Sequence, residues 1–309
     1  YEITTRLVGS EMCIRDSVMI MGHSISDTDA FGAAIGIYCA ARVLGKKAQI
    51  VLDQVTSSLR PLKEGFTTEK GYPPDMFVSS ERALELTDYN TLVMVVDVNR
   101  PSHTECPGLL KRTDSIVVFD HHRQSSEVIS NPVLSYIEPY ASSTCEMVAE
   151  VLQYFTENIK LAPHEADCIY AGILIDTSNF MTKTGVRTFE AAAYLKRCGA
   201  EVTRVRKMLR NDMDAYKARA EVVRHAEVYR GAFAISICPA DKIESPTIVG
   251  AQAADELLNI VGIKASFVLT EYQGKIYVSS RSIDEINVQK IMERLGGGGH
   301  LNMACLLYT

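Results

Sequence analysis

The sequence predicts an α/β domain with a mostly parallel sheet, followed by a smaller α+β domain. Up to about residue 200, short β-branched apolar runs alternate with helical patterns, which is typical of parallel strands joined by helices. After residue 230 the order changes to a strand, a helix and a hairpin. The length of 309 residues, at roughly 150 residues per domain, also favours two domains.

The first domain is expected to span residues 18–200. Its strands are predicted from short buried apolar runs, and its helices from apolar residues spaced three and four apart. The predicted strands are 18–21, 48–52, 91–96 and 115–119. The predicted helices are 29–44, 80–86, 143–156 and 163–175.

The second domain is expected to span residues 231–304, after a charged helical linker at 201–230. A hairpin is expected to turn at Gln273-Gly274, and a last helix runs into Gly296–Gly299 and His300. The chain then stops soon afterwards, so this domain looks truncated. Its predicted elements are a strand at 232–238, a helix at 247–260, hairpin strands at 265–272 and 275–280, and a helix at 288–295.

The two ends of the chain do not read like the middle. Residues 1–17 have neither helical nor strand periodicity, and residues 305–309 end without a finished element. The stretches GSEMCIRDS and CLLYT also resemble translated sequencing-adapter sequence. We therefore expect residues 1–17 to be foreign or disordered and residues 305–309 to be foreign, as an expression scar would be.

The composition is that of an ordinary globular protein, with 47% hydrophobic and 23% charged residues. The longest apolar stretch, 33–41, is far below the roughly 18 residues of a membrane span, and no signal-peptide core is present. Eight cysteines without a CxxC pair argue against a zinc ribbon and a disulfide framework. The net charge of −6 leaves no basic surface for duplex nucleic acid. We expect a cytoplasmic protein.

Acidic and histidine side chains follow three of the predicted strands. Ligands of open α/β sheets bind outside the carboxyl ends of the strands, so these side chains should meet at one edge. They are His23, Asp27, Asp29, Asp97, Asp120, His121 and His122. Each has an ordinary alternative, because a single Asp after a strand is often a turn former, and Asp29 is placed to be a helix N-cap.

Several uncompensated carboxylates at one edge would repel each other unless a cation neutralised them. Asp and His ligands without thiolates suit Mn²⁺ or a related divalent ion better than structural zinc. Asp176 ends an apolar helix and is a further candidate, although the spacing alone also fits a helix-end turn residue. A divalent metal site is therefore expected at the carboxyl edge of the sheet.

Taken together, these residues resemble the DHH phosphoesterase superfamily over essentially all of 18–304. The resemblance implies two Mn²⁺ ions, with Mg²⁺ or Co²⁺ as alternatives, and a shared water that attacks phosphorus in line. It places His23 and Asp27 on one ion, Asp29, His121 and Asp176 on the other, and Asp97 between both. It also implies that Asp120 orients a ligand histidine and that His122 faces the substrate phosphate. Arg100 and Arg123 are either phosphate contacts or ordinary exposed arginines.

The second domain resembles the DHH-associated domain, in which an arginine and a glycine-rich segment ending in histidine bind nucleotides. The resemblance implies that Arg281, Gly297, Gly298, Gly299 and His300 contact the substrate. Glycine amides approach phosphates closely because no Cβ intervenes, although a glycine run is more often a flexible linker.

Within the superfamily the chain looks most like the cyclic-di-AMP phosphodiesterases of the GdpP type, which implies opening of cyclic di-AMP to linear 5′-pApA. The resemblance rests on VMIMGH, VVDVNRPSHTE, VVFDHHR, YIEPYASSTCEMVAEVLQYF, GILIDTSNF and INVQKIMERLGGGGHLNMA. Ser142 and Ser143 are candidate substrate contacts, but Ser143 and Glu146 also form a capping-box pattern. Ser24 and Ser26 depart from the basic residue and proline that are usual there.

Two other functions stay open at this point. A nanoRNase or pAp phosphatase shares the same motifs and would act on short linear oligoribonucleotides or pAp. A cyclic-dinucleotide sensor without activity would be expected to lack a metal ligand, whereas all six positions are filled here. Full-length GdpP relatives carry upstream membrane helices, so the resemblance implies a catalytic part that faces the cytoplasm and does not itself contact the membrane. A homodimer is left open.

Overall fold

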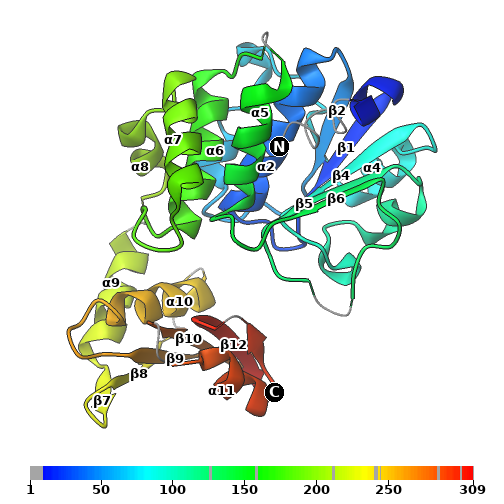
Figure 1. The fold of residues 1–309 in the computed structure, drawn as a ribbon. Helices are drawn as coiled ribbons and strands as arrows, with labels where there is room; N and C mark the ends of the chain where they lie inside the picture. Colours follow the sequence, from blue (N-terminus) through cyan, green and yellow to red (C-terminus); the bar gives the residue numbers. More distant parts are fainter. Residues whose placement is uncertain are drawn as a thin grey trace. The chain divides into compact units, whose positions relative to one another are not determined.

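The computed structural model describes residues 10–124, 127–156, 159–210, 213–239, 243, 245–283, 286–299 and 301–308. The chain divides into two compact units, Tyr1–Leu209 and Arg210–Thr309 (Figure 1). The division falls inside the segment expected to be a helical linker. None of the helices in the described residues is both long enough and apolar enough to cross a membrane.

The first unit contains a six-stranded sheet with the order β3-β2-β1-β4-β5-β6, and all its paired strands are parallel. This confirms the predicted parallel sheet. The strand order reverses between β1 and β4, so the loops after these two strands face each other at the carboxyl edge. The strands are β1 (Ser17–Met21), β2 (Lys47–Val51), β3 (Phe77–Val78), β4 (Thr91–Val96), β5 (Ile116–Asp120) and β6 (Leu134–Ile137).

Helices cover both faces of this sheet (Figure 1). Alternate residues of β1 face opposite sides, so Ile20 packs with the large helices while Met19 and Met21 pack with the shorter ones. On the first face lie α2 (Thr28–Val43), α5 (Thr144–Phe155) and α6 (Pro163–Asp176), with α7 (Val186–Arg197) and α8 (Val202–Met208) outside them. The other connections are α3 (Arg60–Lys63), α4 (Ser80–Leu86), η1 (Thr68–Lys70), η2 (Pro101–His103) and η3 (Pro107–Lys111).

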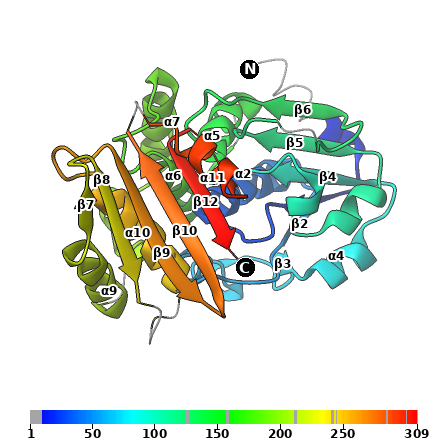
Figure 2. The ribbon, with the colours of Figure 1, turned by 90° about the horizontal axis from the view of Figure 1, so that it is seen from below.

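The second unit is built on another six-stranded sheet, with the order β11-β12-β10-β9-β8-β7. Helix α10 packs on one face against β9 and β10, and α11 packs on the opposite face against Phe267 and Val278 (Figure 2). Gln273 and Gly274 have φ values of 53° and 72°, so the hairpin turns where it was predicted. The elements are α9 (Met213–Arg224), β7 (Glu227–Tyr229), β8 (Phe233–Cys238), α10 (Pro246–Leu257), β9 (Ala265–Tyr272), β10 (Lys275–Ser282), α11 (Val288–Arg294), β11 (Gly298–Gly299) and β12 (Met303–Tyr308).

The end segments are ordered where the structure describes them. Residues 10–14 are helical, and the side chain of Met12 is fully buried in the core of the first unit. Residues 303–308 form β12, which pairs with β10 from Arg281↔Met303 to Ile276↔Tyr308. Disorder is therefore wrong for residues 10–17, and the second sheet includes residues 305–308. A foreign origin of either segment stays a prediction.

Candidate metal centre at the carboxyl edge of the first sheet

The predicted acidic and histidine residues come from the carboxyl ends of three central strands and from two helix ends. β1 is followed by His23 and Asp27, β4 by Asp97, and β5 ends at Asp120. The backbone of the loop after β1 is held by hydrogen bonds from Ser24 N to His103 O and from Glu105 N to Gly22 O. Asp29 lies in the first turn of α2, and Asp176 is the last residue of α6.

The structure brings these side chains into three groups that could each hold a metal ion, with ligand atoms within 4.8 Å of one another. One group is His23, Asp27 and Asp97, the second is Asp29, His121 and Asp176, and the third is Asp97, His121 and His122. The first two groups contain the residues that the resemblance assigns to two separate ions, with Asp97 in the first group only. The ligand roles themselves stay predictions.

Asp97 faces both predicted ion positions. Its Oδ2 lies 3.7 Å from His23 Nε2, and its Oδ1 lies 3.4 Å from His121 Nε2. The residue is 3% exposed and has a φ of 63°, which is uncommon for residues with a Cβ but tolerated by Asp and Asn. This left-handed backbone turns the chain sharply at the end of β4, where Asp97 N donates to Phe119 O at 2.8 Å. The geometry fits a bridging carboxylate.

Asp29 is held by the start of α5 and is not the N-cap of α2. Its two carboxylate oxygens accept hydrogen bonds from Thr144 N at 2.7 Å and Cys145 N at 2.9 Å, and its side chain is fully buried. The N-cap is Asp27, which accepts from the amides of Asp29 and Ala30, so the alternative interpretation of Asp29 as a cap is wrong. A helix N-terminus stabilises negative charge, which explains how a buried carboxylate is tolerated there.

Burial and the crowding of carboxylates shift the pKa values of the centre. Burial, together with repulsion from Asp29 and Asp27, raises the pKa of Asp97 and of Asp176 well above the usual value. Burial also lowers the pKa of His121. Burial is also the largest influence on His23 and opposes its protonation, but the hydrogen bond with Asp27 and the nearby carboxylate charges together outweigh burial and raise the pKa of His23. The positive groups of the chain therefore do not balance the negative charge of the carboxylates at this edge, and such an excess of negative charge favours a bound cation.

Asp120 is paired with His122, which belongs to the third group, and the expected role of Asp120 in orienting a metal-ligand histidine stays a prediction. Asp120 Oδ1 lies 2.8 Å from His122 Nδ1 and accepts from His122 N at 3.0 Å. The side-chain amide of Asn99 donates to the other oxygen of Asp120. Sequence reasoning missed Asn99, although its position two residues after Asp97 was a usable signal. The three side chains form a chain that fixes His122 at the edge of the site.

Among the predicted substrate contacts of the first unit, the two serines point inward. Ser142 and Ser143 are 1% and 0% exposed. The Ser142 hydroxyl donates to Glu146 at 2.5 Å, and Ser143 Oγ accepts from Glu146 N at 3.0 Å as the N-cap of α5. The helix-cap interpretation of Ser143 is confirmed, and neither hydroxyl is exposed to a ligand. Arg123, like Arg100, has an exposed side chain.

The predicted contacts of the second unit have structural partners of their own. Arg281 is 7% exposed, and its Nε donates to Asp255 Oδ1 at 2.6 Å. A Cβ added to Gly297 would lie 2.4 Å from Cys305 O, and one added to Gly299 would lie 2.4 Å from Ala304 Cα. Close packing on β12 therefore explains these two glycines. Nucleotide binding by this set stays a prediction, with Gly298 facing open space and His300 outside the described residues.

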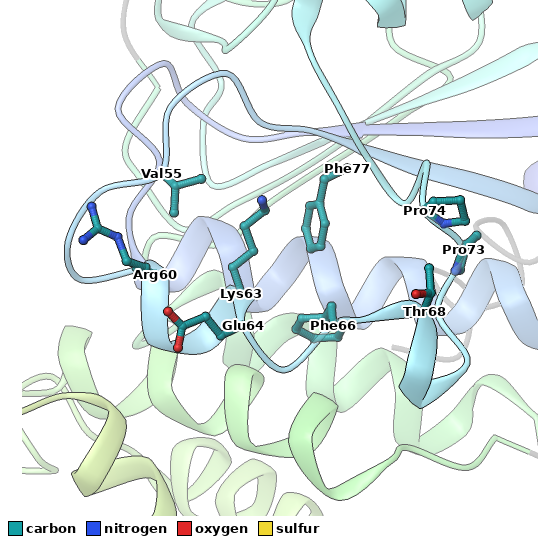
Figure 3. A pocket seen from close by; sticks show the side chains of 9 residues that line it. All are labelled: Val55, Arg60, Lys63, Glu64, Phe66, Thr68, Pro73, Pro74 and Phe77. Carbon is teal, nitrogen blue, oxygen red and sulfur yellow. The ribbon is translucent and has the colours of Figure 1, made fainter.

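A separate cavity of about 470 Å³ lies beside α3 and shares no residue with the acid–histidine groups (Figure 3). Arg60 and Lys63 line it together with two aromatic rings, Phe66 and Phe77. The Lys63 ammonium group lies 5.3 Å from the centroid of the Phe77 ring, and Phe31 stacks on the same ring. Neighbouring side chains already contact this ring, and nothing in the lining selects a ligand.

Comparison with known proteins agrees with the fold and with these motifs. The chain is 42% identical over 293 residues to the cyclic-di-AMP phosphodiesterase GdpP of Geobacillus thermodenitrificans, covering 94% of this chain. It is 39% identical to the cyclic-di-AMP phosphodiesterase PdeA of Listeria monocytogenes, again over 94% of this chain. The chain spans 44% of the length of each of these relatives.

A similar fold occurs in an exopolyphosphatase-related protein from Bacteroides fragilis, with a TM-score of 0.85 at 18% identity, covering 99% of this chain and 91% of that one. Residues 233–306 match the DHHA1 domain, which confirms the predicted associated domain. Residues 17–173 match the N-terminal domain of the DHH family, and this match covers every acidic and histidine candidate of the metal centre except Asp176. The chain therefore belongs to the DHH family.

Proposed function

We propose that this chain is the catalytic part of a phosphodiesterase that uses two Mn²⁺ ions to hydrolyse cyclic di-AMP to linear 5′-pApA. The observation that carries the proposal is the position of Asp97, whose two oxygens face two separate groups of ligand atoms. The names of the similar GdpP and PdeA proteins support cyclic di-AMP as the substrate.

The residues fit a pair of divalent ions. The two groups offer carboxylates and imidazoles without a thiolate, which is a donor set that suits Mn²⁺. His23, Asp27 and Asp97 would hold one ion, and Asp29, His121 and Asp176 the other, with Asp97 shared. The pKa values of Asp97 and Asp176 are raised by burial and by repulsion between neighbouring carboxylates, and a bound cation would offset the negative charge of these groups.

The chain's own residues then have distinct tasks. When bound, the ions supply a water of lowered pKa and offset charge on the phosphate. Asp120 holds the imidazole of His122, which is 41% exposed, at the edge where a phosphate would approach. Hydrolysis adds the water oxygen to phosphorus and releases the ribose 3′ oxygen, which takes up a proton. Opening one of the two diesters of the ring in this way leaves a linear dinucleotide with a 5′-phosphate.

Parallel assays on cyclic di-AMP, pApA and pAp test the proposal. Mn²⁺ is titrated into the metal-free chain, and the products are identified by mass spectrometry. We expect cyclic di-AMP to give pApA faster than pApA or pAp is consumed. A higher rate on pApA or pAp would instead favour a nanoRNase or pAp phosphatase, and binding of cyclic di-AMP without turnover would favour a sensor.

A charge-neutral variant tests the two-ion arrangement. Asp97→Asn keeps a residue that tolerates the left-handed backbone but removes the shared carboxylate. We expect loss of Mn²⁺-dependent turnover and fewer bound ions by metal analysis. Asp114→Asn is the matched control, because Asp114 is exposed just before β5, at the opposite edge of the sheet. Parental turnover in Asp97→Asn would overturn the two-ion proposal.

A further inference from the structure

A tight turn, Glu138–Ala141, connects β6 to α5 at the same edge of the sheet as the acid–histidine groups. The turn closes with a hydrogen bond of 3.0 Å from Ala141 N to Glu138 O. Glu138 N donates to Asp120 O at 3.0 Å, which ties the start of the turn to the end of β5. Pro139 restricts φ at the second position, as is common in such turns.

Both sides of this turn are anchored. Glu138 Oε2 lies 3.8 Å from Arg187 Nη1, and Arg187 also donates to both carboxylate oxygens of Glu150, at 2.7 and 2.8 Å. After the turn, residues 141–144 are buried, and Thr144 bonds to Asp29 and Asp97. The backbone around the turn is therefore fixed relative to the carboxylates.

Tyr140 is the exception in this anchored segment. Its side chain is 93% exposed, the largest value for an aromatic residue in the described part of the chain. Scattered exposed apolar side chains are normal, so the exposure alone says little. Here, however, a rigid turn holds an aromatic ring in water between Glu138, which is bonded to Asp120, and Thr144, which is bonded to Asp97. A preorganised aromatic loses little conformational entropy when a flat ligand binds it.

We propose that Tyr140 is the platform on which one nucleobase of the substrate stacks while the phosphate lies at the acid–histidine groups. This inference rests on the proposed function of the same site. Two peptide steps of about 3.8 Å each separate Tyr140 from Glu138, whose amide donates to Asp120 O at 3.0 Å, so the backbone of Tyr140 lies close to the end of β5 and its acid–histidine residues. Stacking of this kind accepts any base, so the platform adds affinity for nucleotides as a class over simple phosphodiesters.

Kinetics of two substitutions test the platform. In Tyr140→Ala we expect KM for cyclic di-AMP to rise on the order of 10-fold to 100-fold with little change in kcat. Tyr140→Phe keeps the ring and should restore the parental KM. Tyr89→Ala is the matched control, because Tyr89 is 79% exposed but precedes β4, at the opposite edge of the sheet. A parental KM in Tyr140→Ala, in a chain that turns over cyclic di-AMP, would overturn the inference.

Fluorescence tests the same contact without turnover. The chain contains no tryptophan, so Tyr140→Trp introduces a single indole whose emission a stacked adenine quenches. With Mg²⁺ present, we expect saturable quenching by cyclic di-AMP and by AMP but none by ribose 5-phosphate, which has no base. Tyr89→Trp should show no quenching with any of the three.

These readouts separate the two proposals. Quenching in Tyr140→Trp without turnover by the parent chain would retain the platform and reject the proposed hydrolysis. Absence of quenching at concentrations where calorimetry shows cyclic di-AMP to be bound would reject the platform and leave the hydrolysis intact.

Discussion

The hydroxyl of Thr144 donates a 2.9 Å hydrogen bond to Oδ1 of Asp97, and the amide of the same residue donates a 2.7 Å hydrogen bond to Oδ2 of Asp29. The first residue of α5 thus contacts two carboxylates that we assign to the metal centre. One of them faces both predicted ion positions. Thr144 is a positioning residue, because it acts through these carboxylates and not on the substrate.

Replacing Thr144 by valine should weaken metal binding. Valine is close to threonine in size but lacks the hydroxyl, so Asp97 loses a hydrogen bond that fixes its orientation. Loss of a group that orients a metal ligand typically costs about 10-fold to 100-fold in metal affinity. We expect a loss in that range for Mn²⁺, measured by calorimetric titration of the metal-free chain. Thr144→Ser should recover most of it, and parental affinity in Thr144→Val would contradict the role.

Gly172 leaves space for Asp29 where α6 crosses α2. A Cβ added there would lie 2.4 Å from Cys145 Sγ and 2.9 Å from Asp29 Oδ1. Gly172→Ala should therefore destabilise the chain by about 1–3 kcal/mol through overpacking and should displace Asp29. Denaturant unfolding and Mn²⁺ titration measure the two effects. Gly185→Ala is the control, because a Cβ at Gly185 meets nothing within 4 Å; equal unfolding free energies in both variants would be inconsistent with the crowding.

Stability of the metal-free chain should fall as the pH rises. The fold raises the pKa of Asp97 and Asp176, so it favours their protonated forms. This contribution is fully present below the usual carboxyl pKa and is lost as the pH rises through the raised values. Mn²⁺ binds the ionised forms, so it should increase Tm more at about pH 8 than at about pH 5.5, measured by thermal unfolding with and without chelator. In Asp176→Asn the difference should shrink, whereas the same Tm gain at both pH values would contradict the expectation.

The sequence was sufficient for the parts of the site that lie next to a strand end. Asp97 directly follows β4 and Asp120 is the last residue of β5. The carboxyl ends of parallel strands meet at one edge of the sheet, whatever the rest of the fold is. Thr144 could not be found this way, because its contacts with Asp29 and Asp97 depend on how α5 packs against strands distant in the sequence. The exposure of Tyr140 could not be predicted from the sequence either, since a Tyr in a turn can be buried or exposed.

Two strands that backbone pairing stabilises, β6 and β12, were also not predicted from the sequence. β6 has no clean alternation of buried and exposed residues, and β12 is stabilised by its ladder with β10. Gly297 and Gly299 show a related limit. Glycine indicates that something approaches the backbone closely, but the sequence does not say whether it is a phosphate or a neighbouring strand. Here it is β12.

The left-handed backbone of Asp97 limits which residue types can replace this carboxylate, which the two proposed ions would share. At a φ of 63°, only glycine, asparagine and aspartate are accommodated readily, so most replacements would strain the end of β4. Asparagine alone keeps both the backbone and the side-chain shape while removing the charge. A single Asp97→Asn change would thus remove the charge of the shared position while leaving the end of β4 unstrained.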